Sequence, residues 1–181
     1  MEKRRGINLG RPSWDTLFMS IAFEVAARAS CNYIRAGVVI VKDNRIIATG
    51  YNGAAPGVPN CLEAGCRKQQ QGIANELKGT GECRGTHAEM NALQYAGREA
   101  HDSTLYTVLF PCNHCAKQAA SVGVDRVIYA IKYKDSDPTA AMETLSQAGI
   151  QVHYFNDLHK EGFNGEYEKQ HKRILEVIAQ G

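Results

Sequence analysis

The chain lacks long apolar runs and has little net charge. Lys and Arg number 21 against 19 Asp and Glu, which leaves a formal charge of +2. No apolar run approaches the ~20 residues that span a bilayer, and the N-terminus lacks the apolar region of a secretory signal. These absences argue against a membrane partner. They predict a cytoplasmic protein, or one in the host cytoplasm if a phage encodes the chain.

The small charge also argues against a nucleic-acid partner, because such proteins present a broad basic surface. The one dense basic run, Lys3-Arg4-Arg5, is close to the N-terminus, where chains commonly fray, and we interpret it as solvated. A chain of 181 residues is long enough to bury one compact core. We therefore expect a single domain over 1–181.

The chain does contain six cysteines. In a cytoplasmic protein, cysteines more often bind metal or stay reduced than form disulfides. Cys112 and Cys115 follow Pro111 and are three positions apart, so a helix would place both sulfurs on one face. His87 and Glu89 precede them in the sequence. One imidazole and two thiolates fill three positions of a tetrahedral zinc site and leave the fourth for water, as in a catalytic site.

Glu89 follows His87 by two residues, so it lies near the metal without being a ligand and can move protons. Pro111 suits the first turn of a helix, and helix N-termini aimed at a metal favour thiolate over thiol. The alternative is a zinc knuckle or a disulfide, with Glu89 as an ordinary solvated residue. However, His-x-Glu followed by Pro-Cys-x-x-Cys is the signature of zinc-dependent nucleobase deaminases.

Hydrophobic periodicity and turn residues predict alternating helices and strands. After a helix and a hairpin, the stretch 50–85 is rich in Gly, Pro, Asn, Gln and Cys and is predicted to be a long loop with one short helix near 68–72. The expected helices cover 12–29, 87–94, 112–122 and 138–148, and the expected strands 37–41, 45–49, 103–109, 126–131 and 150–155. This α/β alternation favours parallel strands covered by helices. The predicted fold is a three-layer α/β/α sandwich on a mixed five-stranded sheet, with a C-terminal extension at 156–181 that includes a helix over 166–179.

With these residues in place, the chain resembles the deoxycytidylate (dCMP) deaminases, within the zinc-dependent cytidine and deoxycytidylate deaminase superfamily. The resemblance covers roughly 17–155. It is carried by Gly50-Tyr51-Asn52-Gly53, by the run His87-Ala88-Glu89-Met90-Asn91-Ala92, and by the segment from Leu105 to Cys115. It implies a cytidine deaminase-like fold and hydrolysis of dCMP to dUMP and ammonia, which feeds thymidine nucleotide synthesis. In such enzymes a zinc-bound hydroxide attacks C4, and the residue corresponding to Glu89 transfers protons.

The resemblance also implies residues that bind the nucleotide. Asn52 resembles the residue that approaches the sugar and base, although Asn52-Gly53 also reads as a simple turn. Arg28 and Ser30 resemble positions near the 5′-phosphate, which needs charge-assisted donors, although Arg28 equally reads as a surface helix residue. The expected substrate-binding set is Arg28, Ser30, Asn52, Ala88, Tyr133 and Lys134.

Several members of the resembled family hold a second, structural zinc. Cys31 and Cys61 match that pattern. Relatives complete the site with His or an acidic residue before the His-Ala-Glu run, where this chain offers Cys83 instead. The expected second site is Cys31, Cys61, Cys66 and Cys83. The alternative is four ordinary reduced cysteines.

Enzymes that resemble this chain are often hexamers, activated by dCTP with Mg²⁺ and inhibited by dTTP. The resemblance thus implies a homo-oligomer, with a hexamer favoured, and these nucleotides as effectors. The regulatory candidates are Gly50, Tyr51, Gly53, Arg98 and the loop 54–59. The alternatives for the chain as a whole are a deaminase of another nucleoside or base (cytidine, guanine, a riboflavin precursor or tRNA adenosine) and a non-catalytic nucleotide-sensing or DNA-uptake protein. Glu89 argues against the last of these, because a structural zinc needs no spare carboxylate.

Overall fold

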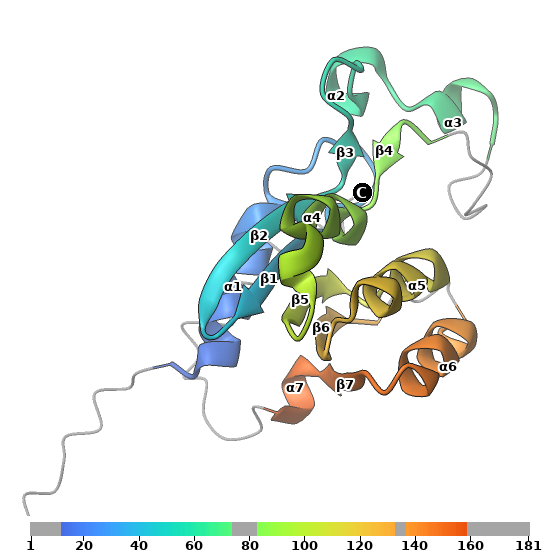
Figure 1. Ribbon diagram of the computed structural model, residues 1–181. Coiled ribbons are helices and arrows are strands. Elements are labelled where there is room, and N and C mark those ends of the chain that lie inside the picture. The colour runs from blue at the N-terminus through green and yellow to red at the C-terminus, as the bar shows by residue number, and fades with distance from the viewer. Residues whose placement is uncertain (1–11, 74–82, 133–136, 159–181) are drawn as a thin grey trace, which may run out of the picture.

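The computed structural model describes residues 12–73, 83–132 and 137–158, and a five-stranded sheet lies at its centre (Figure 1). The strands of this sheet are β1 (Gly37–Lys42), β2 (Arg45–Tyr51), β5 (Thr104–Leu109), β6 (Arg126–Ile131) and β7 (Gln151–Tyr154). Their spatial order is β2, β1, β5, β6, β7. β1 is antiparallel to β2 and β5, whereas β6 is parallel to β5 and β7. The predicted mixed five-stranded sheet is confirmed.

Helices cover both faces of this sheet (Figure 1). They are α1 (Trp14–Ala26), α4 (Ala88–Ala96), α5 (Asn113–Val122), α6 (Thr139–Gln147) and the short α7 (Phe155–Leu158). Val39 of β1 belongs to the core beneath α1 and α7, whereas Val38 and Ile40 belong to the core beneath α4, α5 and α6. Successive side chains of a strand point to opposite faces, so β1 supplies both cores. The predicted three-layer sandwich is confirmed.

The hairpin between β1 and β2 turns at Asp43 and Asn44, as predicted. Their φ angles are 51° and 56°, and Lys42 pairs with Arg45 across the turn. Two central residues with positive φ define the turn whose twist matches that of the flanking strands. Asp and Asn tolerate this conformation better than other residues with a side chain.

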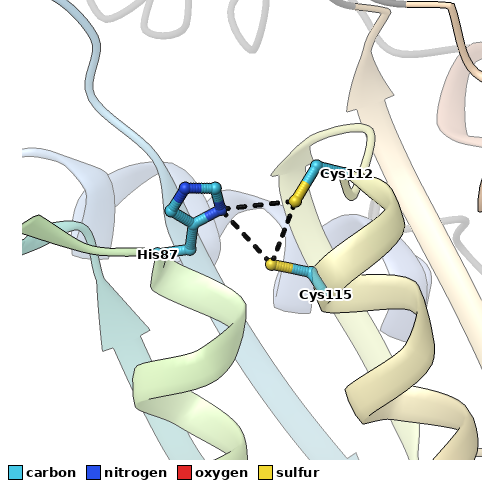
Figure 2. A group of neighbouring side chains, drawn as sticks. All are labelled: His87, Cys112 and Cys115. Atoms are coloured by element: carbon cyan, nitrogen blue, oxygen red, sulfur yellow. Dashed lines mark hydrogen bonds between the residues drawn. The ribbon is translucent and has the colours of Figure 1, made fainter. Parts of the chain in front are cut away.

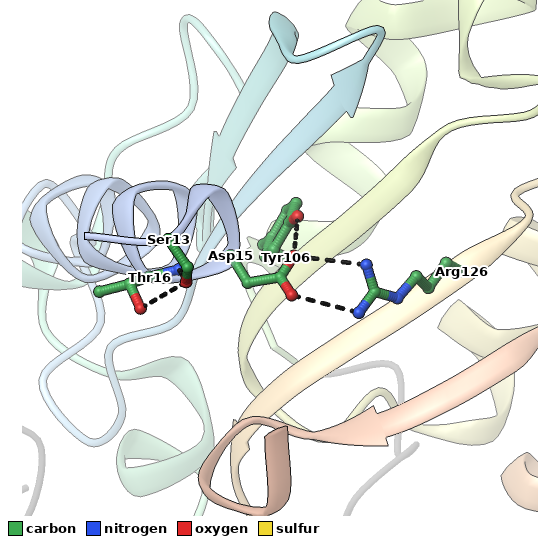
Figure 3. A network of polar contacts seen from close by, with 5 residues as sticks. All are labelled: Ser13, Asp15, Thr16, Tyr106 and Arg126. Atoms are coloured by element: carbon green, nitrogen blue, oxygen red, sulfur yellow. Dashed lines mark hydrogen bonds and ion pairs between the residues drawn. The ribbon is translucent and has the colours of Figure 1, made fainter. Parts of the chain in front are cut away.

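Polar contacts hold the N-terminus of α1 against the sheet (Figure 3). Ser13 caps the helix by accepting a hydrogen bond from the Thr16 amide at 3.1 Å. The Asp15 carboxylate accepts hydrogen bonds from the Tyr106 hydroxyl at 2.6 Å and from the Arg126 guanidinium at 3.2 and 3.3 Å. Burial and the bond to Asp15 raise the pKa of Tyr106, so the phenol remains a donor. The network fixes α1 over β5 and β6.

The described parts of the segment 50–85 contain more regular structure than predicted. The expected short helix is α3 (Arg67–Gln70), but the structure adds a second helix, α2 (Cys61–Ala64), and a two-stranded ladder of β3 (Gly53–Ala54) with β4 (Gly85–Thr86). Asn60 and Glu63 form a capping box at the start of α2. This pattern is readable in the sequence, whereas elements of two to four residues are too short to show a hydrophobic period.

The last predicted strand is slightly too long, because β7 ends at Tyr154 and Phe155 begins α7, with its ring buried in the core beneath α1. Several predictions fall outside the described residues: Tyr133, Lys134, the basic run at 3–5 and the helix over 166–179. Among the described helices, none combines the length and apolar character needed to traverse a bilayer.

Candidate metal centre

His87, Cys112 and Cys115 come together where two helices begin (Figure 2). His87 is the N-cap residue of α4, and Cys112 is the N-cap residue of α5, whose first turn contains Cys115. Both cap residues have extended backbone. α5 starts just beyond the carboxyl end of β5, at the edge where parallel α/β sheets bind ligands. The sequence predicted both helix starts and their convergence.

The three ligand atoms lie at separations that suit a tetrahedral zinc ion. His87 Nδ1 is 3.5 Å from Cys112 Sγ and 3.4 Å from Cys115 Sγ, and the two sulfurs are 3.6 Å apart. Bond lengths of about 2.3 Å to sulfur and about 2.1 Å to nitrogen, at tetrahedral angles, place two sulfurs about 3.8 Å apart and a sulfur about 3.6 Å from nitrogen. The donor set therefore fits zinc with shifts of a few tenths of an ångström.

The two thiols of this site ionise differently. The hydrogen bond between the two sulfurs lowers the pKa of Cys112 to about 3, against the effect of burial and with help from His87. The same hydrogen bond, together with burial and the nearby Glu89 carboxylate, raises the pKa of Cys115. A coordinating thiol loses its proton to the charge of the metal. Zinc binding must therefore release the Cys115 proton, and zinc affinity should increase with pH.

Glu89 lies beside the three ligands without joining them. The Cys115 thiol donates to its Oε2 at 3.5 Å, but the group of metal-binding atoms within 4.8 Å of one another contains only His87, Cys112 and Cys115 among the described residues. The side chain of Glu89 is only 6% exposed. This burial raises its pKa, and the neighbouring His87 opposes part of the shift. Glu89 is thus a buried acid next to the metal position that holds its proton more tightly than an ordinary glutamic acid.

Three candidate ligands beside a buried acid are the arrangement found in hydrolytic zinc centres, in which water takes the fourth coordination position. The order in which they occur along the chain is that of zinc-dependent nucleobase deaminases. The chain belongs to the cytidine and deoxycytidylate deaminase family, whose zinc-binding region matches residues 12–131.

Three comparisons illustrate the relationship. The chain is 38% identical to a deoxycytidylate deaminase of Saccharomyces cerevisiae over 150 residues, which covers 82% of this chain but only 46% of the yeast protein. It is 39% identical to the deoxycytidylate deaminase of Mycobacterium phage D29 over 124 residues, or 67% of this chain and 97% of the phage protein. The dCMP deaminase of cyanophage S-TIM5, solved in complex with dCMP and dUMP, shares 27% identity, covering 80% of this chain and 98% of that one, with a TM-score of 0.65.

The four remaining cysteines lie near one another but not at ligand distances. Burial raises the pKa of Cys61, and Cys31, Cys66 and Cys83 raise it further through electrostatic interaction. The Cys31 sulfur accepts hydrogen bonds from two backbone amides at 3.3 and 3.4 Å, and the Cys83 sulfur accepts one from Gly85 at 3.4 Å.

Arg28 and Ser30 line a cavity of about 620 Å³ at the C-terminal end of α1. Tyr51 and the loop expected to bind effectors also line this cavity, and neither a zinc ligand nor Glu89 is part of its lining. Arg35 adds a second cation, and its guanidinium donates to the Ala27 carbonyl at 3.4 Å. The structure therefore groups Arg28 with the expected regulatory residues.

Asn52 lies between β2 and β3, and its side chain is bound by backbone. Its Nδ2 donates to the Ile34 carbonyl at 2.9 Å, and its Oδ1 accepts from the Ala36 amide at 2.7 Å. One N–H and one lone pair of the amide remain for a ligand. Asn52 therefore does not only form a turn with Gly53, because its side chain also joins this turn to Ile34 and Ala36.

The other expected residues are placed as follows. Ala88 is fully buried, so it can serve a ligand only through its backbone N–H in the first turn of α4, where helix amides have no intrahelical partner. A side chain at Gly50 would overlap the Ala88 carbonyl. Arg98 is exposed in the 3₁₀ turn Gly97–Ala100 that follows α4, away from the cavity lining.

Proposed function

We propose that the chain catalyses the hydrolytic deamination of dCMP to dUMP and ammonia. The observation that carries the proposal is the buried Glu89 carboxylate beside a three-ligand zinc geometry. Two relatives named deoxycytidylate deaminase and a solved dCMP deaminase with its substrate and product support the choice of base and sugar.

The residues around the metal position have different roles in the proposed reaction. Zinc held by His87, Cys112 and Cys115 would supply an activated water at neutral pH. Glu89 would carry the proton in this reaction: it would take it up from the attacking water, deliver it to ring N3 of the cytosine, and then help to protonate the departing amino group. One carboxyl group must therefore act as both base and acid, and the pKa of Glu89, raised by burial, suits both roles.

Four residues are the candidates for recognition of the nucleotide. Asn52 offers its remaining amide hydrogen and lone pair to the sugar or base, and the Ala88 amide offers a donor at the helix N-terminus. Tyr133 and Lys134 follow β6, and they remain candidates for the 5′-phosphate. Their alanine variants should raise KM for dCMP more than KM for deoxycytidine.

Arg28 and Ser30 can serve either the substrate phosphate or an effector. Because they share the cavity with the loop 54–59 and not with the zinc ligands, we favour the effector role, with dCTP and Mg²⁺ as activator and dTTP as inhibitor. The volume of about 620 Å³ lies within the range of about 300–1,000 Å³ typical of small-molecule sites. In Arg28→Ala, an unchanged KM for dCMP together with a lost response to dCTP supports this role. A rise in KM for dCMP but not for deoxycytidine assigns Arg28 to the substrate.

A second zinc bound by Cys31, Cys61, Cys66 and Cys83 forms part of the proposal. These residues are brought near one another by the connection after α1, by α2 and α3, and by the residues before β4, and a closed four-thiolate site would join these short elements. Metal analysis of the purified protein should give two zinc ions per chain. We also propose a homo-oligomer, with a hexamer favoured, which light scattering would measure.

The decisive test is ammonia release across dCMP, deoxycytidine, CMP, dCTP and guanine. Preference for dCMP supports the proposal, whereas turnover of guanine or of the free nucleoside in preference to dCMP assigns another substrate to the same centre. Zinc-loaded protein that releases ammonia from none of them would point to a non-catalytic binding role.

A further inference from the structure

The segment from Gly50 to Gly53 packs against Thr86 and Ala88, the neighbours of the zinc ligand His87 in the sequence. A side chain at Gly50 would overlap the Ala88 carbonyl, and Gly53 pairs with Thr86 in the β3–β4 ladder. The segment therefore runs alongside the residues on either side of His87 in the sequence, with Gly50 next to Ala88 and Gly53 next to Thr86. Any displacement of this segment changes the distance between Asn52 and the metal.

One side chain joins the segment to the zinc-bearing helix. Asn91 Nδ2 donates to the Tyr51 carbonyl at 2.7 Å, and the Asn91 amide donates to the His87 carbonyl at 3.0 Å within the first turn of α4. Asn91 thus contacts the backbone of both the metal ligand and the segment that carries Asn52. The bond from Nδ2 crosses between elements 40 positions apart in the sequence.

The segment is held on its other side by the connection between α1 and β1. The Asn52 backbone accepts from the Ser30 amide and donates to the Ala36 carbonyl, both at 3.2 Å, in addition to the two bonds of its side chain. A Cβ on Gly53 would lie only 2.6 Å from Ser30 Oγ, so these two segments of the chain are in close contact. The bonds through Asn52 fix the segment to the α1–β1 connection, and the bond from Asn91 fixes it to the metal-bearing helix.

We propose that Asn91 is a positioning residue for nucleotide recognition. It acts through the Tyr51 carbonyl, holds Asn52 at a fixed place relative to the zinc, and does not itself touch substrate or metal. This inference rests on the proposed deamination of dCMP. Loss of the bond should weaken substrate binding while leaving the metal ligands and Glu89 in place, because these belong to α4 and α5 and not to the segment.

The test compares Asn91→Ala with Asn91→Asp, which keeps the size of the side chain but replaces the donor by an acceptor facing a carbonyl. Both variants should keep the wild-type catalytic zinc and a kcat close to wild type. Their KM for dCMP should rise about threefold to tenfold, the range set by one lost hydrogen bond. Gln94→Ala, an exposed change one turn further along α4, is the matched control and should leave KM unchanged.

A second readout does not depend on turnover. Hydrogen exchange at the Ser30 and Ala36 amides, whose acceptors belong to Asn52, should accelerate in both variants and not in Gln94→Ala. Wild-type KM and unchanged exchange in Asn91→Asp would overturn the proposal, as would a KM that rises in Asn91→Ala alone, since that result assigns the effect to side-chain volume. If wild-type protein does not deaminate dCMP, the proposed function fails, and the exchange measurement still decides whether Asn91 positions the segment.

Discussion

The two cysteine groups of this chain are built on different kinds of scaffold. Cys112 and Cys115 belong to the start of α5, and with His87 at the start of α4 they bring their ligand atoms within 3.6 Å of one another. The other four cysteines lie on connections and on helices of four residues, and among the described residues they form no group with ligand atoms within 4.8 Å.

The fold alone places His87, Cys112 and Cys115 at ligand distances, so we call this group a prepared site. The other four cysteines would reach ligand distances only when a metal binds. Helices packed on a sheet are held by two hydrophobic cores, so their first turns are fixed before zinc arrives. Short elements outside those cores gain order from the ion itself, and its binding free energy becomes folding free energy. Zinc at the His87, Cys112 and Cys115 site should therefore contribute mainly chemistry, and a zinc at the proposed second site mainly stability.

Removal of a catalytic ligand provides the largest expected effect. Cys112→Ser should lose one zinc per chain and reduce ammonia release to background, because the open coordination position depends on three strong ligands. The melting temperature should change little, because both helices remain packed on the sheet. Zinc analysis, activity and thermal unfolding of the same preparation measure this. A cooperative loss of the whole fold would contradict the idea of a prepared site.

Glu89→Gln tests the chemistry while the ligands stay in place. The variant should retain zinc and bind dCMP, but kcat should fall by about 10²- to 10⁴-fold, the usual contribution of a positioned acid–base group. Isothermal titration with dCMP and steady-state kinetics separate binding from turnover. Turnover near the wild-type rate would remove Glu89 from the mechanism.

Cys83→Ser tests the second group. If the four thiolates bind zinc, this variant should lose one zinc per chain and lower the melting temperature by several degrees, while kcat per catalytic zinc falls less than tenfold. Hydrogen exchange should accelerate first in α2 and α3, which lie outside the two hydrophobic cores. Exposed Ser121→Ala, on α5, is the control and should change neither zinc content nor exchange in α2 and α3. Unchanged zinc content in Cys83→Ser would mean that the four thiols are ordinary cysteines.

The same contrast explains what could be predicted from the sequence. The large helices and all strands of the central sheet except the four-residue β7 follow from hydrophobic patterns of six or more residues. Cys112 and Cys115 follow from their spacing within one helical turn. β3, β4 and α2 were missed because elements of two to four residues show no period. Their stability comes from contacts between distant segments and from the capping box of Asn60 and Glu63.

Residues assembled from several segments were the hardest to place. Arg35 lies in a connection without a motif, and only the structure brings it to the same cavity as Arg28 and Glu63. The sequence shows Asn91 only as part of a family run. Its bond to the Tyr51 carbonyl depends on how α4 packs on β2, which has no local signal in the sequence. Local spacing reveals a metal site on helix ends, whereas a cavity formed by loops has no local signal.

The smallest expected effect is the change in the free energy of unfolding that burial of Glu89 causes. Burial raises the pKa of Glu89 in the folded chain above its ordinary value of 4.5. The folded state therefore binds this proton more tightly than the unfolded state. The resulting stabilisation is fully present below about pH 4.5 and is lost as pH rises through the folded pKa.

Glutamine cannot ionise, so metal-free Glu89→Gln should be more stable than metal-free wild type at neutral pH. The difference should shrink toward zero as pH falls below about 4.5. Urea unfolding with a chelator across this pH range measures the difference in the free energy of unfolding. Equal stability of the two proteins at neutral pH would show that burial of the Glu89 carboxylate does not destabilise the fold. Zinc should narrow the gap, because its charge favours the ionised acid. A variant that is more stable without metal, yet inactive with it, would show that the fold keeps Glu89 buried for chemistry at the expense of stability.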